Sequence, residues 1–168
     1  MQHKEKQRSD APRNDAFAGM NDPAEKLFAC GEQLKTTAMK LYHEGELEKR
    51  RNTWGRERMR LLGYLILVPV LQALAAEYLL KGLAARDKES YIKTHDLHCL
   101  YTDLGQTTRD RLDVVVVSEI ETKLPEYLKA HRNDFVNWRY VVFEPGQATT
   151  HHLVFDNVLA ALVDASNA

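Results

Sequence analysis

Residues 61–76 form the longest apolar run in the chain, sixteen residues with almost no polar interruption. The run contains Pro69 and Gln72, and Glu77 and Lys81 follow it directly. A membrane-spanning helix needs about twenty apolar residues, so this run is short for a bilayer. The stretch after Pro69 is rich in good helix formers, and Glu77 and Lys81 have the spacing of a favourable i,i+4 pair. We therefore predict a core helix of a soluble protein and no membrane association.

The composition is typical of one soluble globular domain. The chain has 168 residues, of which 44% are hydrophobic and 28% charged, and this length is enough to bury a core. Lys and Arg total 23 while Asp and Glu total 24, a balance that excludes a general polycationic coat for nucleic acid. Cys30 and Cys99 are far apart and outside any CxxC motif. We therefore expect free thiols and a cytoplasmic location rather than a zinc site or a redox pair.

The start of the chain differs from the rest in its pattern. Residues 1–22 are polar and without periodicity, which predicts a disordered leader followed by a single domain over 23–168. Asp22 and Pro23 are typical of a helix start, with Asp22 as the cap and Pro23 in the first helical position. Apolar spacing then predicts a first helix that runs to about residue 50.

Three further helical segments follow the central helix in the apolar pattern. A short helix begins at 94–96 and stops at Gly105, a longer one covers 126–143, and a last amphipathic helix covers 152–163. None of these segments contains a Gly-rich phosphate loop, and no carboxylate pattern completes a metal site around the histidines. We expect no cofactor and no metal.

Residues 112–117 are the ambiguous segment. Four consecutive valines, at 114–117, favour a strand. A helical spacing also links five apolar residues over 112–124, and no glycine or hairpin turn signal lies nearby: Leu112, Val115, Val116, Ile120 and Leu124. We predict a helix here, with Pro125 either kinking it or opening the next one. The sequence as a whole then predicts an all-α, up-and-down bundle of five or six helices.

The only concentrated basic stretch in the chain is Lys49–Arg60, which holds six basic residues and one acidic one. A solvated helix end or connection explains it most simply, and an RNA-contacting surface is the alternative. In that alternative, the contacts come from Arg50, Arg51, Arg56 and Arg58.

Two segments, taken in order, resemble the core of the HEPN superfamily (higher eukaryotes and prokaryotes nucleotide-binding domain). Residues 73–83 read Ala-Leu-Ala-Ala-Glu-Tyr-Leu-Leu-Lys-Gly-Leu, an apolar helix with an E-x-x-x-K pair, and residues 94–100 contain the H-D-L-x-x-L pattern. Residues 131–140 sit where the family places its signature helix. The resemblance covers about residues 25–145 and implies an up-and-down helical bundle that dimerises. Many members are metal-independent ribonucleases of toxin–antitoxin or antiphage systems.

The resemblance also implies candidate catalytic residues. Arg132 and Asn133 match the first half of an Arg-polar-x-x-x-His motif, but positions 136–138 read Val-Asn-Trp where the His should fall. Metal-free RNA cleavage needs a general base, and His is the side chain whose ordinary pKa lies near neutrality. If the protein is active, Arg132 would clamp the scissile phosphate, Asn133 would orient it, and His131 or His95 would be the base.

The arginines of the signature segment also have a structural explanation. Arg132 and Arg139 are seven residues apart, hence on nearly one face of the predicted helix, and could contact phosphates together. Alternatively, Arg132 forms an ion pair with Glu126 or Asp134.

The remaining candidates are explained better by structure than by chemistry. Trp138 and Tyr140 could stack on a base, but aromatic residues at helical spacing more often belong to a core or an interface. Glu77 and Lys81 are expected to form a buried salt bridge that anchors the signature helix. His95 lies in a helix start, where capping by its neighbours is the simplest role.

The leading hypothesis is a cytoplasmic, prokaryotic, HEPN-like homodimer that handles RNA or nucleotides in defence or stress response, with endoribonuclease activity left open because the motif His is absent. The alternative is a non-catalytic helical module, such as an antitoxin partner or adaptor, that binds another protein.

Overall fold

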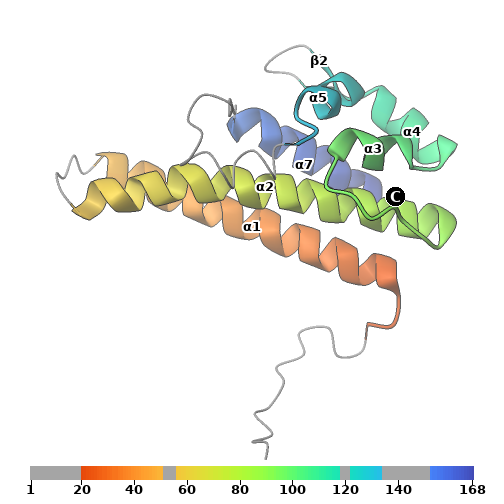
Figure 1. Ribbon diagram of the computed structural model, residues 1–168, viewed down its shortest axis with the longest axis horizontal. Helices are drawn as coiled ribbons and strands as arrows, with labels where there is room; N and C mark the ends of the chain where they lie inside the picture. Colours follow the sequence, from red (N-terminus) through yellow and green to blue (C-terminus); the bar gives the residue numbers. More distant parts are fainter. Residues whose placement is uncertain (1–19, 51–55, 118–121, 134–151) are drawn as a thin grey trace, which may run out of the picture.

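The computed structural model describes residues 20–50, 56–117, 122–133 and 152–168. In these ranges the protein is all-α, with six helices and one two-residue strand pair (Figure 1), which confirms the predicted fold class. The helices are α1 (Pro23–Arg50), α2 (Arg56–Lys88), α3 (Leu97–Thr102), α4 (Gln106–Asp113), α5 (Leu124–Ala130) and α7 (His152–Ser166).

Helix α1 begins as its sequence predicts. The Asp22 carboxylate accepts a hydrogen bond from the Ala24 N–H at 2.8 Å, and Pro23 occupies the first helical position. A capping side chain satisfies one of the backbone donors that a helix start leaves open. The helix ends at Arg50, as the apolar pattern predicts.

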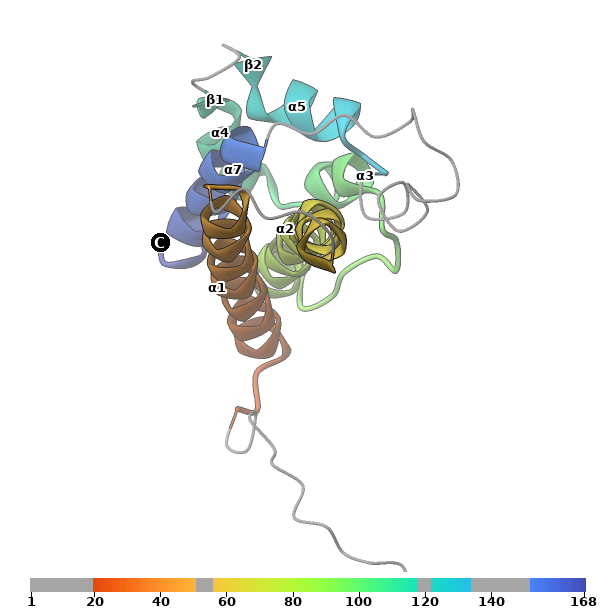
Figure 2. The same cartoon turned by 90° about the vertical axis from the view of Figure 1, so that its left-hand side faces the viewer.

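Helices α1 and α2 pack antiparallel and in close contact (Figure 2). Two glycines permit the approach. A Cβ at Gly31 would lie 2.7 Å from Leu79 Cγ, and one at Gly82 would lie 2.6 Å from the Phe28 ring. Since carbon atoms in contact are normally about 3.5–4.0 Å apart, only glycine fits these positions without displacement.

Helix α2 is the central element, and Pro69 lies inside it. Its segment Gly63–Lys88 is long and apolar enough to cross a membrane, with half of the most apolar window buried inside the protein. A core helix of a soluble protein has the same length and composition. The burial agrees with the predicted core helix.

The short helices and α7 cover the C-terminal half of α2 (Figures 1 and 2). A single apolar core forms between them and α2, as expected for layers that each bury one face. Its largest fully buried side chains are Leu79, Leu80, Leu83, Leu97, Leu100, Leu112, Leu124, Tyr127, Leu128, Phe155, Leu159 and Leu162.

The helix predicted over residues 112–124 is wrong. Helix α4 ends at Asp113, and strand β1 (Val116–Val117) pairs antiparallel with β2 (Thr122–Lys123). The Leu124 N–H also donates to the Val115 carbonyl at 3.0 Å. Because β-branched side chains are restricted in χ1 within a helix, the second half of the valine run is better placed in this extended pair.

The helix predicted over residues 126–143 is interrupted after Ala130. Helix α5 starts at Leu124 with Pro125 in its first turn and ends at Ala130, and residues 131–133 form a turn. The Leu97 N–H lies in the first turn of α3, where the helix itself offers it no acceptor. It donates to the Arg132 carbonyl at 3.0 Å. This tertiary hydrogen bond holds the turn. Residues 134–143 lie outside the described residues, and the final predicted helix is confirmed as α7.

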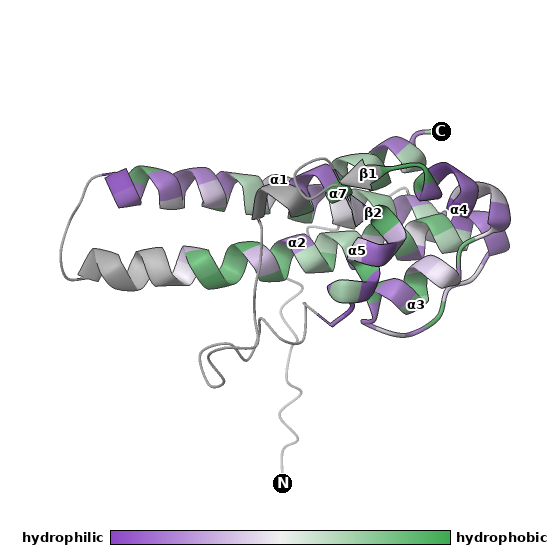
Figure 3. Ribbon diagram, turned by 90° about the horizontal axis from the view of Figure 1, so that it is seen from above, coloured by the Kyte–Doolittle hydropathy of each residue, from purple (hydrophilic) through white to green (hydrophobic). Residues whose placement is uncertain are grey.

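The α1–α2 hairpin extends beyond the cluster of short helices (Figure 3). In this extension α2 carries apolar residues that no described element covers: Leu65 and Leu67 have exposed fractions of 50% and 49%. Residues two apart on a helix point to different sides, so these leucines are separate exposed apolar positions.

Candidate functional site

The loop before α3 provides the local framework of the site. Asp96 is the N-cap of α3, and its Oδ1 accepts a hydrogen bond from the Cys99 N–H at 2.9 Å. Thr94 Oγ1 accepts from the Asp96 N–H at 3.1 Å. The predicted capping by the neighbours of His95 is therefore confirmed. These bonds fix the backbone on both sides of His95.

Arg132 is bound to the same cap. Its Nε donates to Asp96 Oδ2 at 2.7 Å, and its Nη2 donates to the same oxygen. Nη2 also lies 3.9 Å from Cys99 Sγ. Arg132 forms its ion pair with Asp96 rather than with Glu126, one of its two predicted partners, and the other, Asp134, lies outside the described residues. The arginine side chain keeps an exposed fraction of 46%.

The environment of Asp96 favours its charged form. Partial burial of the carboxyl acts to raise its pKa, but the hydrogen bond from the Cys99 N–H and the Arg132 guanidinium outweigh burial and lower the pKa. Asp96 is thus a carboxylate at neutral pH that holds both the start of α3 and the turn after α5.

Glu77 is a buried carboxylate on α2. Its side chain is only 3% exposed, and both oxygens have partners: Lys81 Nζ lies 2.6 Å from Oε1, and His95 Nδ1 lies 2.8 Å from Oε2. A buried charge is tolerated when it is paired and hydrogen-bonded in this way. The predicted buried Glu77–Lys81 pair is confirmed, but it holds the loop before α3 through His95 rather than the Arg132 segment directly.

His95 and Arg132 therefore belong to one constellation. His95 is fixed to α2 by Glu77, while the next residue, Asp96, holds Arg132. The His95 side chain has an exposed fraction of 56%. The arrangement provides an imidazole oriented by a carboxylate and a guanidinium linked to the same loop, both within reach of solvent. Chemically, such a pair can accept a proton and bind an anion.

His131 lies in a different environment from Arg132. Its ring stacks over Tyr127 with centroids 4.2 Å apart and meets Phe155 edge-on at 6.4 Å. Residue 131 is the C-cap of α5. The aromatic contacts make His131 part of the packing between α5 and α7. Asn133 is exposed in the turn after Arg132.

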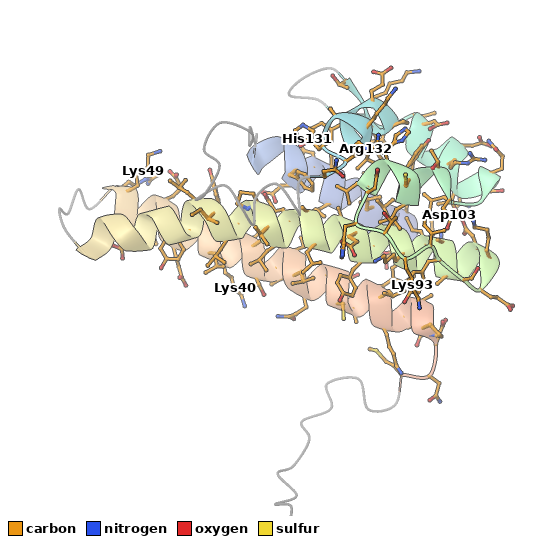
Figure 4. The ribbon with its side chains drawn as sticks, viewed as in Figure 1. Lys40, Lys49, Lys93, Asp103, His131 and Arg132 are labelled. Carbon is orange, nitrogen blue, oxygen red and sulfur yellow. The ribbon has the colours of Figure 1, made fainter. Side chains whose placement is uncertain are left out.

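The described part of the predicted basic surface, Arg50, lies away from this constellation. Arg50 ends α1, and neighbouring Lys49 lies at the far end of the hairpin from Arg132 (Figure 4). Arg51 and the side chains of Arg56 and Arg58 are outside the described residues, as are Trp138, Arg139 and Tyr140.

Sequence reasoning missed the two contacts that define the site. Asp96 and Arg132 are 36 residues apart, and Glu77 and His95 are 18 apart. No local spacing rule connects positions at such separations. A weak signal was available in Glu77 itself, because a carboxylate on an otherwise apolar helix must find partners when it is buried.

Among the described residues, no three His, Cys, Asp or Glu side chains gather in a way that could hold a metal ion. Comparisons with protein-family models, with curated proteins and with solved structures find no match to this chain.

Proposed function

We propose that this protein handles RNA or nucleotides in the manner of the HEPN superfamily and acts as a metal-independent endoribonuclease. The observation that carries the proposal is the constellation of His95 and Arg132, tied to one loop by Glu77 and Asp96. The proposal includes a homodimer in the cytoplasm of a prokaryote, in a toxin–antitoxin, defence or stress system, as the sequence resemblance implies.

The chemistry assigns one role to each side chain. His95 takes the proton of the ribose 2′-hydroxyl, and the resulting oxygen attacks the adjacent phosphorus to form a 2′,3′-cyclic phosphate. The bond to the 5′-oxygen breaks, that oxygen leaves as a hydroxyl with a proton from water, and the imidazolium returns its proton to solvent. Arg132 binds the phosphate as its charge develops. In this assignment His95 supplies the imidazole that the motif lacks at positions 136–138.

Arg132 can hold Asp96 and a phosphate at the same time. An arginine has five N–H donors, and Asp96 engages only Nε and one N–H of Nη2. The pairing with Asp96 fixes the plane of the guanidinium, so less freedom is lost when an anion binds. In this proposal Asn133, the exposed residue that follows Arg132, orients the same anion.

The test is cleavage of a mixed RNA pool by the purified protein in EDTA. Wild type should cleave, and Arg132→Ala and His95→Gln should each lose most of the activity, with a smaller loss for Asn133→Ala. Lys40→Ala is the matched control, because Lys40 is an exposed cation on α1 away from the site (Figure 4). A folded wild-type protein that leaves RNA intact would refute the nuclease proposal.

The second candidate is a non-catalytic helical module that binds a partner protein, as an antitoxin partner or adaptor would. The two separately exposed leucines on the projecting part of α2, Leu65 and Leu67, offer such a partner apolar contact positions. The dependence of binding on salt concentration distinguishes the two candidate functions. RNA binding through arginines such as Arg50 should weaken steeply as salt rises, whereas an apolar protein contact should not.

A further inference from the structure

The hydrogen-bonding capacity of each group around Glu77 determines where the proton on His95 must be. Glu77 as a carboxylate can only accept, and the Lys81 ammonium can only donate. Lys81 Nζ lies 2.6 Å from Oε1, and His95 Nδ1 lies 2.8 Å from Oε2. Both distances are those of short, charge-assisted hydrogen bonds.

A contact of this length to an acceptor requires a donor on the other side. The neutral imidazole has one protonated nitrogen and one with a lone pair, and the partner of one nitrogen fixes the role of the other. With Glu77 against Nδ1, the proton sits on Nδ1 and the lone pair on Nε2. Lys81 offsets the charge of the buried carboxylate, which is only 3% exposed.

We propose that Glu77 is a positioning residue that sets the tautomer of His95, holding Nδ1 protonated and making Nε2 the basic nitrogen. The tautomer follows from the contacts on their own. Its consequence for RNA cleavage rests on the proposed function, because only there does Nε2 take a proton from substrate.

The substitution Glu77→Gln gives a sharp test. The glutamine has nearly the same shape but offers one acceptor and one donor group. Its NH₂ cannot face the Lys81 ammonium, because both groups donate, so its oxygen turns to Lys81. The NH₂ then faces His95 Nδ1, which must accept. We therefore expect the substitution to move the imidazole proton from Nδ1 to Nε2.

The measurement is a long-range proton–nitrogen correlation spectrum of protein labelled with ¹⁵N in its histidines, at a pH where the His95 ring is neutral. The spectrum of His95→Gln identifies the signal among the seven histidines. Wild type should show the Nδ1–H pattern and Glu77→Gln the Nε2–H pattern. A merely structural role for Glu77 would lower the melting temperature without exchanging the two patterns.

Lys81→Met is the matched control, because it leaves the carboxylate as the acceptor and should keep Nδ1 protonated. In Glu77→Gln combined with Lys81→Met, the amide is no longer oriented by the lysine, so both tautomers should appear. An Nε2–H pattern in wild type would overturn the proposal even if Glu77→Gln failed to fold, and so would a folded Glu77→Gln that keeps Nδ1 protonated.

RNA cleavage by the same proteins separates the two proposals. If the tautomer exchanges as expected and Glu77→Gln also lowers kcat with little change in KM, both proposals are supported. If the tautomer exchanges but wild type does not cleave RNA, the nuclease proposal fails and the role of Glu77 toward His95 stands.

Discussion

The close contact between α1 and α2 predicts opposite effects for the same substitution at two helical glycines. In Gly31→Ala, the new Cβ would lie 2.7 Å from Leu79 Cγ, 2.9 Å from its Cδ2 and 3.3 Å from the Ala75 carbonyl oxygen. In Gly63→Ala, the new Cβ meets no atom within 4 Å. Gly63 is thus the matched control for the helix-forming effect of alanine.

The magnitudes follow from the packing. Replacing glycine by alanine within a helix stabilises by about 0.5–1 kcal/mol. At position 31 the contacts are roughly 1 Å too short. Leu79 is fully buried, so its closely packed neighbours oppose a rotation that would move its Cγ away. Overpacking of this kind costs about 1–3 kcal/mol. We expect Gly31→Ala to destabilise by about 1–2 kcal/mol net and Gly63→Ala to stabilise by about 0.5–1 kcal/mol.

The assay is urea unfolding followed by far-ultraviolet circular dichroism, with the slope of each transition compared before free energies are subtracted. A thermal melt should agree, since about 1 kcal/mol shifts the melting temperature by about 2–4 °C in proteins of about 150–250 residues. A Gly31→Ala protein as stable as Gly63→Ala would refute the close packing of α1 on α2 at Leu79.

Substitutions at three further positions test other contacts. Asp96→Asn keeps an oxygen that can cap α3 but loses the charge beside Arg132, so it should destabilise less than Asp96→Ala, which also loses the cap, worth about 1 kcal/mol. The folded state lowers the pKa of Asp96. Its charge therefore stabilises the fold above the unfolded pKa of about 4, and this stabilisation is lost as the pH falls below that value. The urea midpoints of wild type and Asp96→Asn should converge in this acid range. Gly105→Ala would place a Cβ 2.8 Å from Oδ2 of Asp87, which accepts the Gly105 N–H; displacing that carboxylate should cost about 1 kcal/mol in the same assay. Burial, and then a hydrogen bond to a carboxylate, raise the pKa of Tyr101. Its neutral form therefore stabilises the fold up to about pH 10, and this stabilisation is lost at higher pH. In an ultraviolet titration, Tyr101→Phe should lack the last tyrosine to ionise; if the substitution removed an early-ionising tyrosine instead, the burial of Tyr101 would be contradicted.

The candidate site shows why spacing predicts some residues and not their partners. The Glu77–Lys81 pair was predictable because the two residues are one helical turn apart on the same helix. The cap at Asp96 was predictable for the same reason, since capping is local. The contacts of Glu77 with His95 and of Asp96 with Arg132 join separate elements, so their formation depends on how those elements pack.

The sequence by itself determined the all-α class, the start and end of α1, the central helix and the short helix after the Thr94–Asp96 cap. These features rest on the period of apolar residues and on caps, which act within a few positions along the chain. Only the tertiary structure decided where α5 ends and how the valine run pairs. The Leu97 N–H donates to the Arg132 carbonyl in another segment of the chain, and β1 pairs with β2. Such choices depend on hydrogen-bonding partners from distant segments, because a backbone group that leaves a helix must be satisfied elsewhere.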